Sequence, residues 1–128
     1  YHLVPAMTAR QNTALPLILS GAKDAQRQAA DMLSRVGLSH RLDHRPSQLS
    51  GGEQQRVAIA RAFVAAPRLI LADEPTGNLD RRTGSSIVET MFDLCRKTDA
   101  AMLLVTHDES LARQCDRVLA IDDGQVVN

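Results

Sequence analysis

The sequence predicts an α/β fold in which a parallel sheet is flanked by helices and preceded by an α-helical subdomain. In this chain of 128 residues, the part before Pro67 has apolar side chains at helical spacing. Short continuous apolar runs begin only after Pro67. Beyond that point the runs alternate with helical patterns, which is the order of parallel strands joined by helices. We therefore expect a helical subdomain over residues 1–65 and an α/β region over residues 66–128.

The composition limits the classes of function. Hydrophobic residues make up 44% of the chain, which is enough for a core, and with only 2% aromatics that core must be aliphatic. The formal net charge is zero, which argues against binding to a nucleic-acid backbone by bulk charge. Cys95 and Cys115 lack metal-site spacing and fit a reducing, cytoplasmic setting. A disulfide bond between them is the alternative that the sequence leaves open. We see no bilayer-spanning run and no signal peptide, and we expect no nucleic-acid partner.

The first half of the chain predicts two packing helices. A Thr-x-x-Gln capping box starts an apolar-periodic segment over residues 8–20, which continues through an internal proline. A second helix is expected over residues 24–36, with Gly37 as its C-terminal cap. Residues 39–48 are polar and contain a proline, so we expect a loop there.

A turn rich in small residues opens a third helix at residues 49–56, Leu-Ser-Gly-Gly-Glu-Gln-Gln-Arg. Ser50 and Glu53 form a Ser-x-x-Glu capping box. Gly51 and Gly52 allow a ligand to approach the backbone closely, and the free amides of a helix start favour an anion. The alternative is a capped helix without a ligand, because such boxes are common.

The run Leu-Ile-Leu-Ala at residues 69–72 is typical of a strand that is buried on both faces of a sheet. Asp73 and Glu74 follow it directly. After a turn at residues 76–79, Asp80 is placed to cap a long helix with apolar residues on one side.

A second buried strand is expected at residues 102–105, followed by His107. A short helix at residues 111–112 then leads to a third strand at residues 118–121. The turn Asp-Asp-Gly predicts that this strand returns as a hairpin over residues 122–127.

Polar residues fall at the carboxyl ends of the predicted strands, where parallel sheets bind ligands. Asp73 offers the hard oxygen that Mg²⁺ prefers, and the next carboxylate, Glu74, is placed to polarise an attacking water. His107 can donate a hydrogen bond to a phosphate. Each residue taken alone also fits a structural role, since carboxylates and histidines are common in turns and Asp80 fits a helix cap.

The motifs at residues 49–53, 69–80 and 105–108, in this order and spacing, resemble the second half of an ABC-transporter ATPase. The resemblance covers essentially the whole chain and implies part of a P-loop NTPase fold, with residues 66–128 as the C-terminal part of the ATPase core. By that resemblance, the residues that serve ATP and Mg²⁺ are Ser50, Gly51, Gly52 and Glu53 in the signature loop, Asp73 as the Walker B metal residue, Glu74 directly after it as the catalytic base, Asp80 in the D-loop and His107 as the switch histidine. Glu53 stands where many members have glutamine.

Residues 74–80 resemble an exporter branch that includes lipoprotein-releasing and macrolide-export ATPases. This resemblance implies a subunit that hydrolyses ATP at the interface of a homodimer, or with a second ATPase subunit. It also implies a position at the inner face of the cell membrane, held there by membrane-spanning transporter subunits that the helical subdomain contacts. The membrane subunits select the substrate in this family, so these residues do not indicate which substrate is transported.

The sequence contains no Walker A pattern, Gly-x-x-x-x-Gly-Lys followed by Ser or Thr. Neither lysine, Lys23 or Lys97, lies in a glycine-rich loop. The start of the chain resembles the segment just after the Q-loop glutamine, so we expect that glutamine and the Walker A before Tyr1. We also expect a gap in the sheet, low stability, and poor ATP binding and no activity for these residues alone.

Two other functions remain open from the sequence. The chain fits a non-catalytic remnant or a partner-binding module that uses its helical subdomain. It also shares its signature and Walker B residues with DNA-repair and chromosome-organising ATPases, which usually place long coiled coils before the signature. No sustained heptad pattern occurs here.

Overall fold

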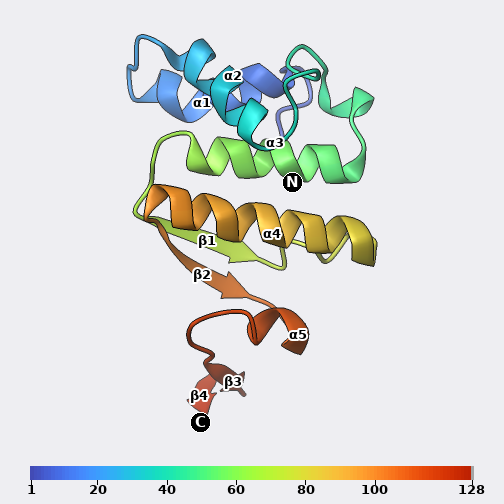
Figure 1. Cartoon of the computed structure of the whole chain (residues 1–128), viewed down its shortest axis with the longest axis vertical. Coiled ribbons are helices and arrows are strands. Elements are labelled where there is room, and N and C mark those ends of the chain that lie inside the picture. The colour runs from blue at the N-terminus through green and yellow to red at the C-terminus, as the bar shows by residue number, and fades with distance from the viewer. Residues whose placement is uncertain (128) are drawn as a thin grey trace.

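The computed structural model describes residues 1–127. Its elements are stacked from the helical N-terminal part to a small C-terminal hairpin (Figure 1). In chain order they are α1 (Ala9–Leu19), α2 (Ala25–Arg35), the 3-10 turn η1 (Pro46–Gln48), α3 (Gly51–Phe63), β1 (Leu69–Asp73), α4 (Arg81–Thr98), β2 (Ala101–Val105), α5 (Glu109–Ala112), β3 (Ala120–Asp122) and β4 (Gln125–Val127).

The helices predicted from capping patterns are present with nearly the expected bounds. The Thr8 hydroxyl accepts from the Gln11 amide, and the Gln11 side chain accepts from the Thr8 amide, so the predicted capping box starts α1. Gly37 lies just beyond α2 with φ +80°, a left-handed conformation that glycine adopts without strain. The predicted loop over residues 39–48 contains the short turn η1, which begins at a proline.

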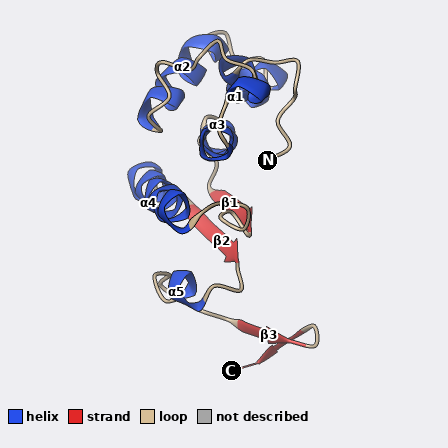
Figure 2. Ribbon diagram, turned by 90° about the vertical axis from the view of Figure 1, so that its right-hand side faces the viewer, coloured by secondary structure: helices blue, strands red, loops and turns tan. Residues whose placement is uncertain are grey.

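Helix α3 lies between the α1–α2 layer and α4 (Figure 2). Its buried side chains face both neighbours and form the middle of one continuous core. The largest fully buried apolar side chains of this core are Phe63, Leu33, Leu38, Ile87, Val36 and Val57. Because these residues come from α2, α3, α4 and the segment after α2, the core fixes the helical part onto α4.

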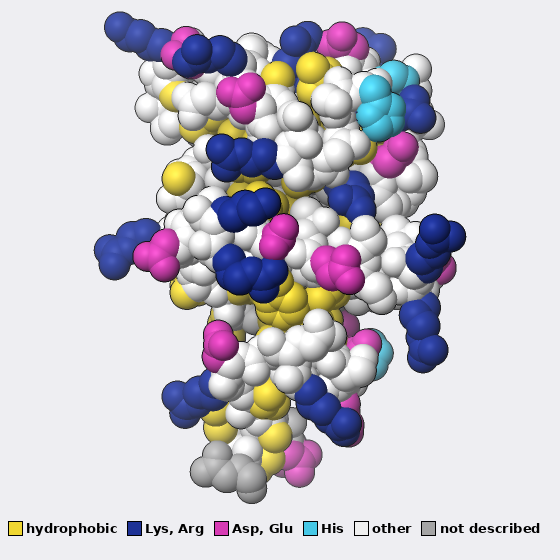
Figure 3. Space-filling model, viewed as in Figure 1, with side chains coloured by type: hydrophobic (Ala, Val, Ile, Leu, Met, Phe, Trp, Pro, Cys, Tyr) yellow, Lys and Arg dark blue, Asp and Glu magenta, His cyan; other side chains and the backbone are white. Residues whose placement is uncertain are grey.

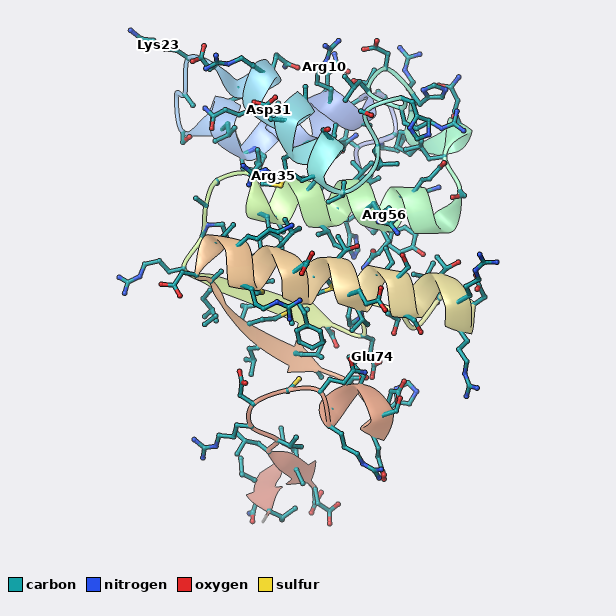
Figure 4. The ribbon with its side chains drawn as sticks, in the orientation of Figure 1. Arg10, Lys23, Asp31, Arg35, Arg56 and Glu74 are labelled. Carbon is teal, nitrogen blue, oxygen red and sulfur yellow. The ribbon has the colours of Figure 1, made fainter. Side chains whose placement is uncertain are left out.

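Arg56 ties three elements together from the middle of α3 (Figure 4). Its Nη1 donates to the Val36 carbonyl at 3.1 Å and to Thr90 Oγ1 at 3.3 Å, and its Nη2 donates to Ser86 Oγ at 2.6 Å. Hydrogen bonds from a charged donor contribute more than neutral ones when they are partly buried. Arg56 therefore stabilises the position of α3 between the end of α2 and one side of α4.

Strands β1 and β2 pair in parallel, from Leu69 opposite Ala101 to Asp73 opposite Val105. Helix α4 packs on one side of this pair, where Ile70 is 6% exposed (Figure 2). The residues of the opposite face are exposed, namely Leu69, Leu71, Leu103 and Val105. The expectation that both strands are buried on both faces is therefore wrong for residues 1–127, because no described element covers that face.

The C-terminal hairpin forms a sheet of its own. Strand β3 pairs antiparallel with β4, and within residues 1–127 it does not pair with β2. The predicted hairpin and the predicted gap in the sheet are thus confirmed, while the third strand begins two residues later than expected, at Ala120. Figure 3 shows apolar side chains over the hairpin and below α4.

Among the described residues, no helix combines the length and the apolar character needed to cross a bilayer.

We predict that Arg56→Met lowers the free energy of unfolding by about 2–3 kcal/mol, because three hydrogen bonds are lost while the aliphatic stem stays packed. Denaturant unfolding followed by circular dichroism measures this change. The matched control is Arg27→Met, which removes only an exposed ion pair with Asp24 and is expected to change stability by less than about 0.5 kcal/mol. Equal effects of the two substitutions would contradict the role given to Arg56.

Candidate functional site

The predicted site residues gather at one side of the molecule. The first turn of α3, the carboxyl ends of β1 and β2 and the first turn of α4 all lie on the right-hand side of Figure 1. This arrangement follows from the chain path, because α3 and α4 each begin at the side where β1 ends. The side therefore combines two helix starts with two strand ends, which is where parallel sheets present ligand sites.

The signature turn, which is the predicted signature loop at residues 50–53, has the predicted capping box. Ser50 Oγ accepts from the Glu53 amide at 3.2 Å, and Glu53 Oε2 accepts from the Ser50 amide at 2.9 Å. The Ser50 amide, and also the guanidinium of Arg41 at 3.4 Å, hold the pKa of Glu53 below its ordinary value. Within residues 1–127, the amides of Gly51 and Gly52 have no protein acceptor. The turn thus presents two free N–H groups and a serine hydroxyl.

Gly52 lies against the first turn of α4. A Cβ atom added to Gly52 would stand 2.6 Å from Thr83 Cγ2, so only glycine fits this contact. Thr83 in turn donates its amide and its hydroxyl to the two carboxylate oxygens of Asp80, at 3.0 and 2.6 Å. The Thr83 hydroxyl, and then its amide, lower the pKa of Asp80. Asp80 is therefore the helix cap of α4 and is linked to the signature turn through Thr83.

Glu74 adopts a left-handed backbone conformation with φ +43°, which is rare for a residue with a side chain. Its amide donates to the Val105 carbonyl at 2.9 Å, so pairing with β2 extends one residue past β1. Its carbonyl accepts from the Gly77 amide at 3.1 Å, which closes the turn. This conformation leaves the Glu74 side chain beside the segment that follows β2.

Glu74 and His107 form a direct pair, as Figure 4 places Glu74 beside the start of α5. Glu74 Oε1 accepts from the His107 amide at 2.9 Å and lies 2.7 Å from His107 Nδ1. Thr106 Oγ1 lies 3.4 Å from Glu74 Oε2. The hydrogen bond between the two side chains is the main cause that lowers the pKa of Glu74 and raises the pKa of His107. Glu74 is thus held ionised, and His107 Nδ1 donates to it.

Asp73 is the last residue of β1 and is exposed. Among the described residues its carboxylate has no hydrogen-bond partner, and no group of three or more His, Cys, Asp or Glu side chains is arranged to hold a metal ion. An exposed carboxylate without a competing partner fits Mg²⁺, which binds through one or two carboxylates and takes its other ligands from water and phosphates. The donor chemistry of this position therefore suits the predicted metal.

Gln55 and Thr83 were not identified from the sequence, although both contact the predicted site segments. Gln55 Nε2 donates to the Pro75 carbonyl at 2.8 Å, and the Gln55 side chain is buried. One signal was available, since Gln55 precedes the apolar Ile59 and Phe63 by four and eight residues and so lies on the buried face of α3. A polar side chain at such a position requires a buried partner.

The structure thus assembles two groups of predicted residues. Glu74 and His107 form one group, and the signature turn with Asp80 forms the other. Among residues 1–127, no hydrogen bond or ion pair joins residues 50–53 to Glu74 or His107. The catalytic, metal and nucleotide-binding roles of these residues stay predictions.

We predict that the Glu74–His107 pair makes a contribution to stability that is small, because the His107 side chain is exposed and that of Glu74 is partly exposed to water, and that depends on pH in a defined direction. The pKa of His107 is raised above 6.5 in the folded chain. Protonated His107 therefore contributes fully to the stability of the fold below pH 6.5, and this contribution is lost as the pH rises through the folded-state pKa. Because the pKa of Glu74 is lowered below 4.5, its effect is present above pH 4.5 and is lost on acidification. A titration of His107 by NMR is therefore expected to have its midpoint above 6.5.

In the same titration, Glu74→Gln is expected to move the His107 midpoint down toward its ordinary value, since the charge and the acceptor of the pair change. Glu89→Gln, on an exposed part of α4, is the control and should leave the midpoint unchanged. An unchanged midpoint in Glu74→Gln would show that the pair does not persist in solution.

Comparison with known proteins identifies relatives for the whole chain. The family model described as ABC transporter matches residues 1–77. The lipoprotein-releasing system ATP-binding protein LolD of Acinetobacter baylyi is 54% identical over 127 residues, which cover 97% of this chain and 56% of that protein. LolD of Legionella pneumophila (strain Paris) is 51% identical over 128 residues, covering 98% and 56%. The chain thus spans about half the length of the curated relatives that it matches.

Solved structures give the same result. The dimeric structure of MJ0796, a bacterial ABC transporter cassette, superposes with a TM-score of 0.84 at 39% identity, over 99% of this chain and 57% of that one. A dimeric post-hydrolysis state of the same ATP-binding cassette, bound to ADP and Pi, gives a TM-score of 0.83 at 38% identity with the same coverage. With the match of the family model to more than half of its residues, the chain belongs to the ABC transporter family.

Proposed function

We propose that this chain supplies the signature loop, the Walker B carboxylates and the switch histidine of an ATP-hydrolysing subunit of an ABC exporter. The observation that carries the proposal is the Glu74–His107 pair at the ends of β1 and β2. An ionised glutamate can accept a proton from water, and the histidine bonded to it is held near the same place, where it can contact a phosphate. The 54% identity to a LolD protein favours the lipoprotein-releasing branch.

In this mechanism Glu74 is the general base. Its lowered pKa keeps the carboxylate ionised at neutral pH, and it accepts a proton from the water that attacks the terminal phosphate. His107 Nδ1 is engaged by Glu74, so the imidazole ring is oriented and its Nε2 is left to donate to a phosphate oxygen. The raised pKa of His107 favours the protonated ring, which donates from both nitrogens.

Asp73 would hold Mg²⁺, directly or through a water molecule. When bound, the ion would offset charge on the phosphate oxygens and orient them for in-line attack. Asp73 stands next to Glu74 but has a regular strand conformation, so its carboxylate and that of Glu74 leave the chain in different directions. The two adjacent carboxylates are therefore available for two separate tasks.

The signature turn would bind the ATP that a second subunit holds. Ser50 and the free amides of Gly51 and Gly52 offer three donors at the positive end of α3, which suits a terminal phosphate. Glu53 keeps the turn closed through the capping box and needs no contact with the nucleotide. The solved relatives described as dimeric support a homodimer, or a pair with a second ATPase subunit.

We further propose that residues 1–65 act as the helical subdomain that contacts membrane-spanning subunits, and that residues 66–128 form part of the ATPase core. This arrangement places the protein at the cytoplasmic face of the membrane through its partners. The sequence contains no Walker A pattern, so the phosphate cradle of the nucleotide would lie outside these 128 residues.

The proposal is tested with a hybrid in which residues 1–128 replace the matching stretch of the Acinetobacter baylyi LolD protein, which is 54% identical. The hybrid is expected to hydrolyse ATP. Glu74→Gln in the hybrid should lower kcat by about 10²–10⁴-fold, the range of general-base catalysis, while ATP binding is retained. Phosphate release and nucleotide titration measure the two quantities. A folded hybrid that binds its membrane partners but hydrolyses no ATP would instead favour the partner-binding module.

A second prediction concerns the metal. Asp73→Asn in the hybrid is expected to raise the Mg²⁺ concentration needed for half-maximal hydrolysis by about tenfold or more, because a neutral amide is a weaker ligand for a hard cation. Asp93→Asn, which removes an exposed carboxylate of α4 that pairs with Arg96, is the matched control. An equal Mg²⁺ requirement in the two variants would refute the role of Asp73.

A further inference from the structure

Gln55 links α3 to the turn that carries Glu74. Its side chain is 9% exposed, and its Nε2 donates to the Pro75 carbonyl at 2.8 Å. Pro75 is itself buried and follows Glu74 directly. A buried amide-to-carbonyl bond between two segments fixes their relative position, because breaking it leaves two polar groups without partners.

The turn at Glu74 needs such support, because its φ of +43° is unfavourable for a residue with a Cβ atom. Among the described residues, three hydrogen bonds fix the backbone at residues 74 and 75. The bond from the Glu74 amide to Val105 holds it to β2, and the bond from the Gly77 amide closes the turn from within. The third comes from Gln55 and is the one supplied by α3.

Gln55 also has a defined position relative to the signature turn, because it is the fifth residue of α3 and the turn is the start of the same helix. The first turn of α3 presents the free amides of Gly51 and Gly52, and the next turn holds Pro75. A helix moves as a rigid element over such a short distance. A displacement at its first turn therefore displaces the Pro75 carbonyl as well.

We propose that Gln55 is a positioning residue that sets the direction of the Glu74 carboxylate toward His107 and couples it to the signature turn. For its meaning in catalysis this inference rests on the proposed function. The claim that Gln55 positions Glu74 does not depend on that function, because the Gln55–Pro75 contact and the Glu74–His107 contact both lie within this chain. The signature turn and the catalytic base of one subunit then respond to each other, although no direct hydrogen bond joins them in residues 1–127.

The first test measures amide hydrogen exchange in the 128-residue chain by NMR. Gln55→Met keeps the length and burial of the side chain but removes the donor. We expect the amides of Gly77 and His107, which bond to Glu74, to exchange about tenfold faster, while amides at Ile87 and Met91 in the buried part of α4 keep their protection. Gln28→Met, on the exposed face of α2, is the matched control and should change neither group.

Gln55→Asn is a second variant that serves if Gln55→Met does not fold. It keeps a polar amide but is one methylene too short to reach Pro75, so it should give the same local loss of protection. Unchanged exchange at Gly77 and His107 in a folded variant would overturn the proposal. An equal loss of protection at Ile87 and Met91 would overturn it too, since Gln55 would then support the core rather than the turn.

The second test is kinetic and uses the hybrid ATPase. Gln55→Met is expected to lower kcat by about 10- to 100-fold, because a misplaced base abstracts the proton poorly, while the KM for ATP changes by less than about twofold. An unchanged kcat, or a fall that comes with an equal rise of KM, would overturn the proposal. If the unmodified hybrid hydrolyses no ATP, the proposed function fails, whereas the exchange experiment still decides whether Gln55 positions Glu74.

Discussion

The contact between the first turns of α3 and α4 is the constraint on which the candidate site depends. Thr83 occupies the space that a Cβ atom of Gly52 would need, so the first turn of α4 packs a side-chain methyl group directly on the backbone of the signature turn. The same Thr83 satisfies Asp80, and Gln55, one turn further along α3, reaches Pro75. The packing contact thus aligns the signature turn with the cap of α4, and the hydrogen bond from the same helix adds the turn of Glu74.

The Glu74–His107 pair shows why this alignment has to come from the backbone. The His107 side chain is 87% exposed, and an exposed ion pair adds little to stability because water competes for both partners. The pair therefore does not hold itself in place. Its geometry is maintained by the strand register that brings Glu74 to Val105 and by the bond from Gln55. The backbone pairing and the Gln55 bond thus stabilise the geometry of this site, whereas the side chains of Glu74 and His107 supply its chemical groups.

Local chemistry explains which features the sequence predicted. The capping boxes at Thr8 and Ser50 and the cap at Asp80 involve residues three positions apart, so their patterns are visible in the chain. Glu74 and His107 were both expected at strand ends, and parallel pairing brings those ends together. The exposure of Leu71 was not predictable, because burial of a strand face depends on whichever element covers it. The Gln55–Pro75 bond joins residues 20 positions apart, and no local pattern encodes it.

The position of Gln55 also bears on how two nucleotide sites could be coordinated. If the signature turn binds the phosphate held by one subunit while Glu74 acts on the phosphate of another site, the two events act on opposite ends of a short path within one chain. That path consists of a single helical turn and one buried hydrogen bond. Because Gln55 is buried and a packed interior permits few intermediate positions, we expect a shift of α3 at Ser50 to displace Pro75 as well. The left-handed turn of Glu74, already unfavourable, is then the element whose geometry responds.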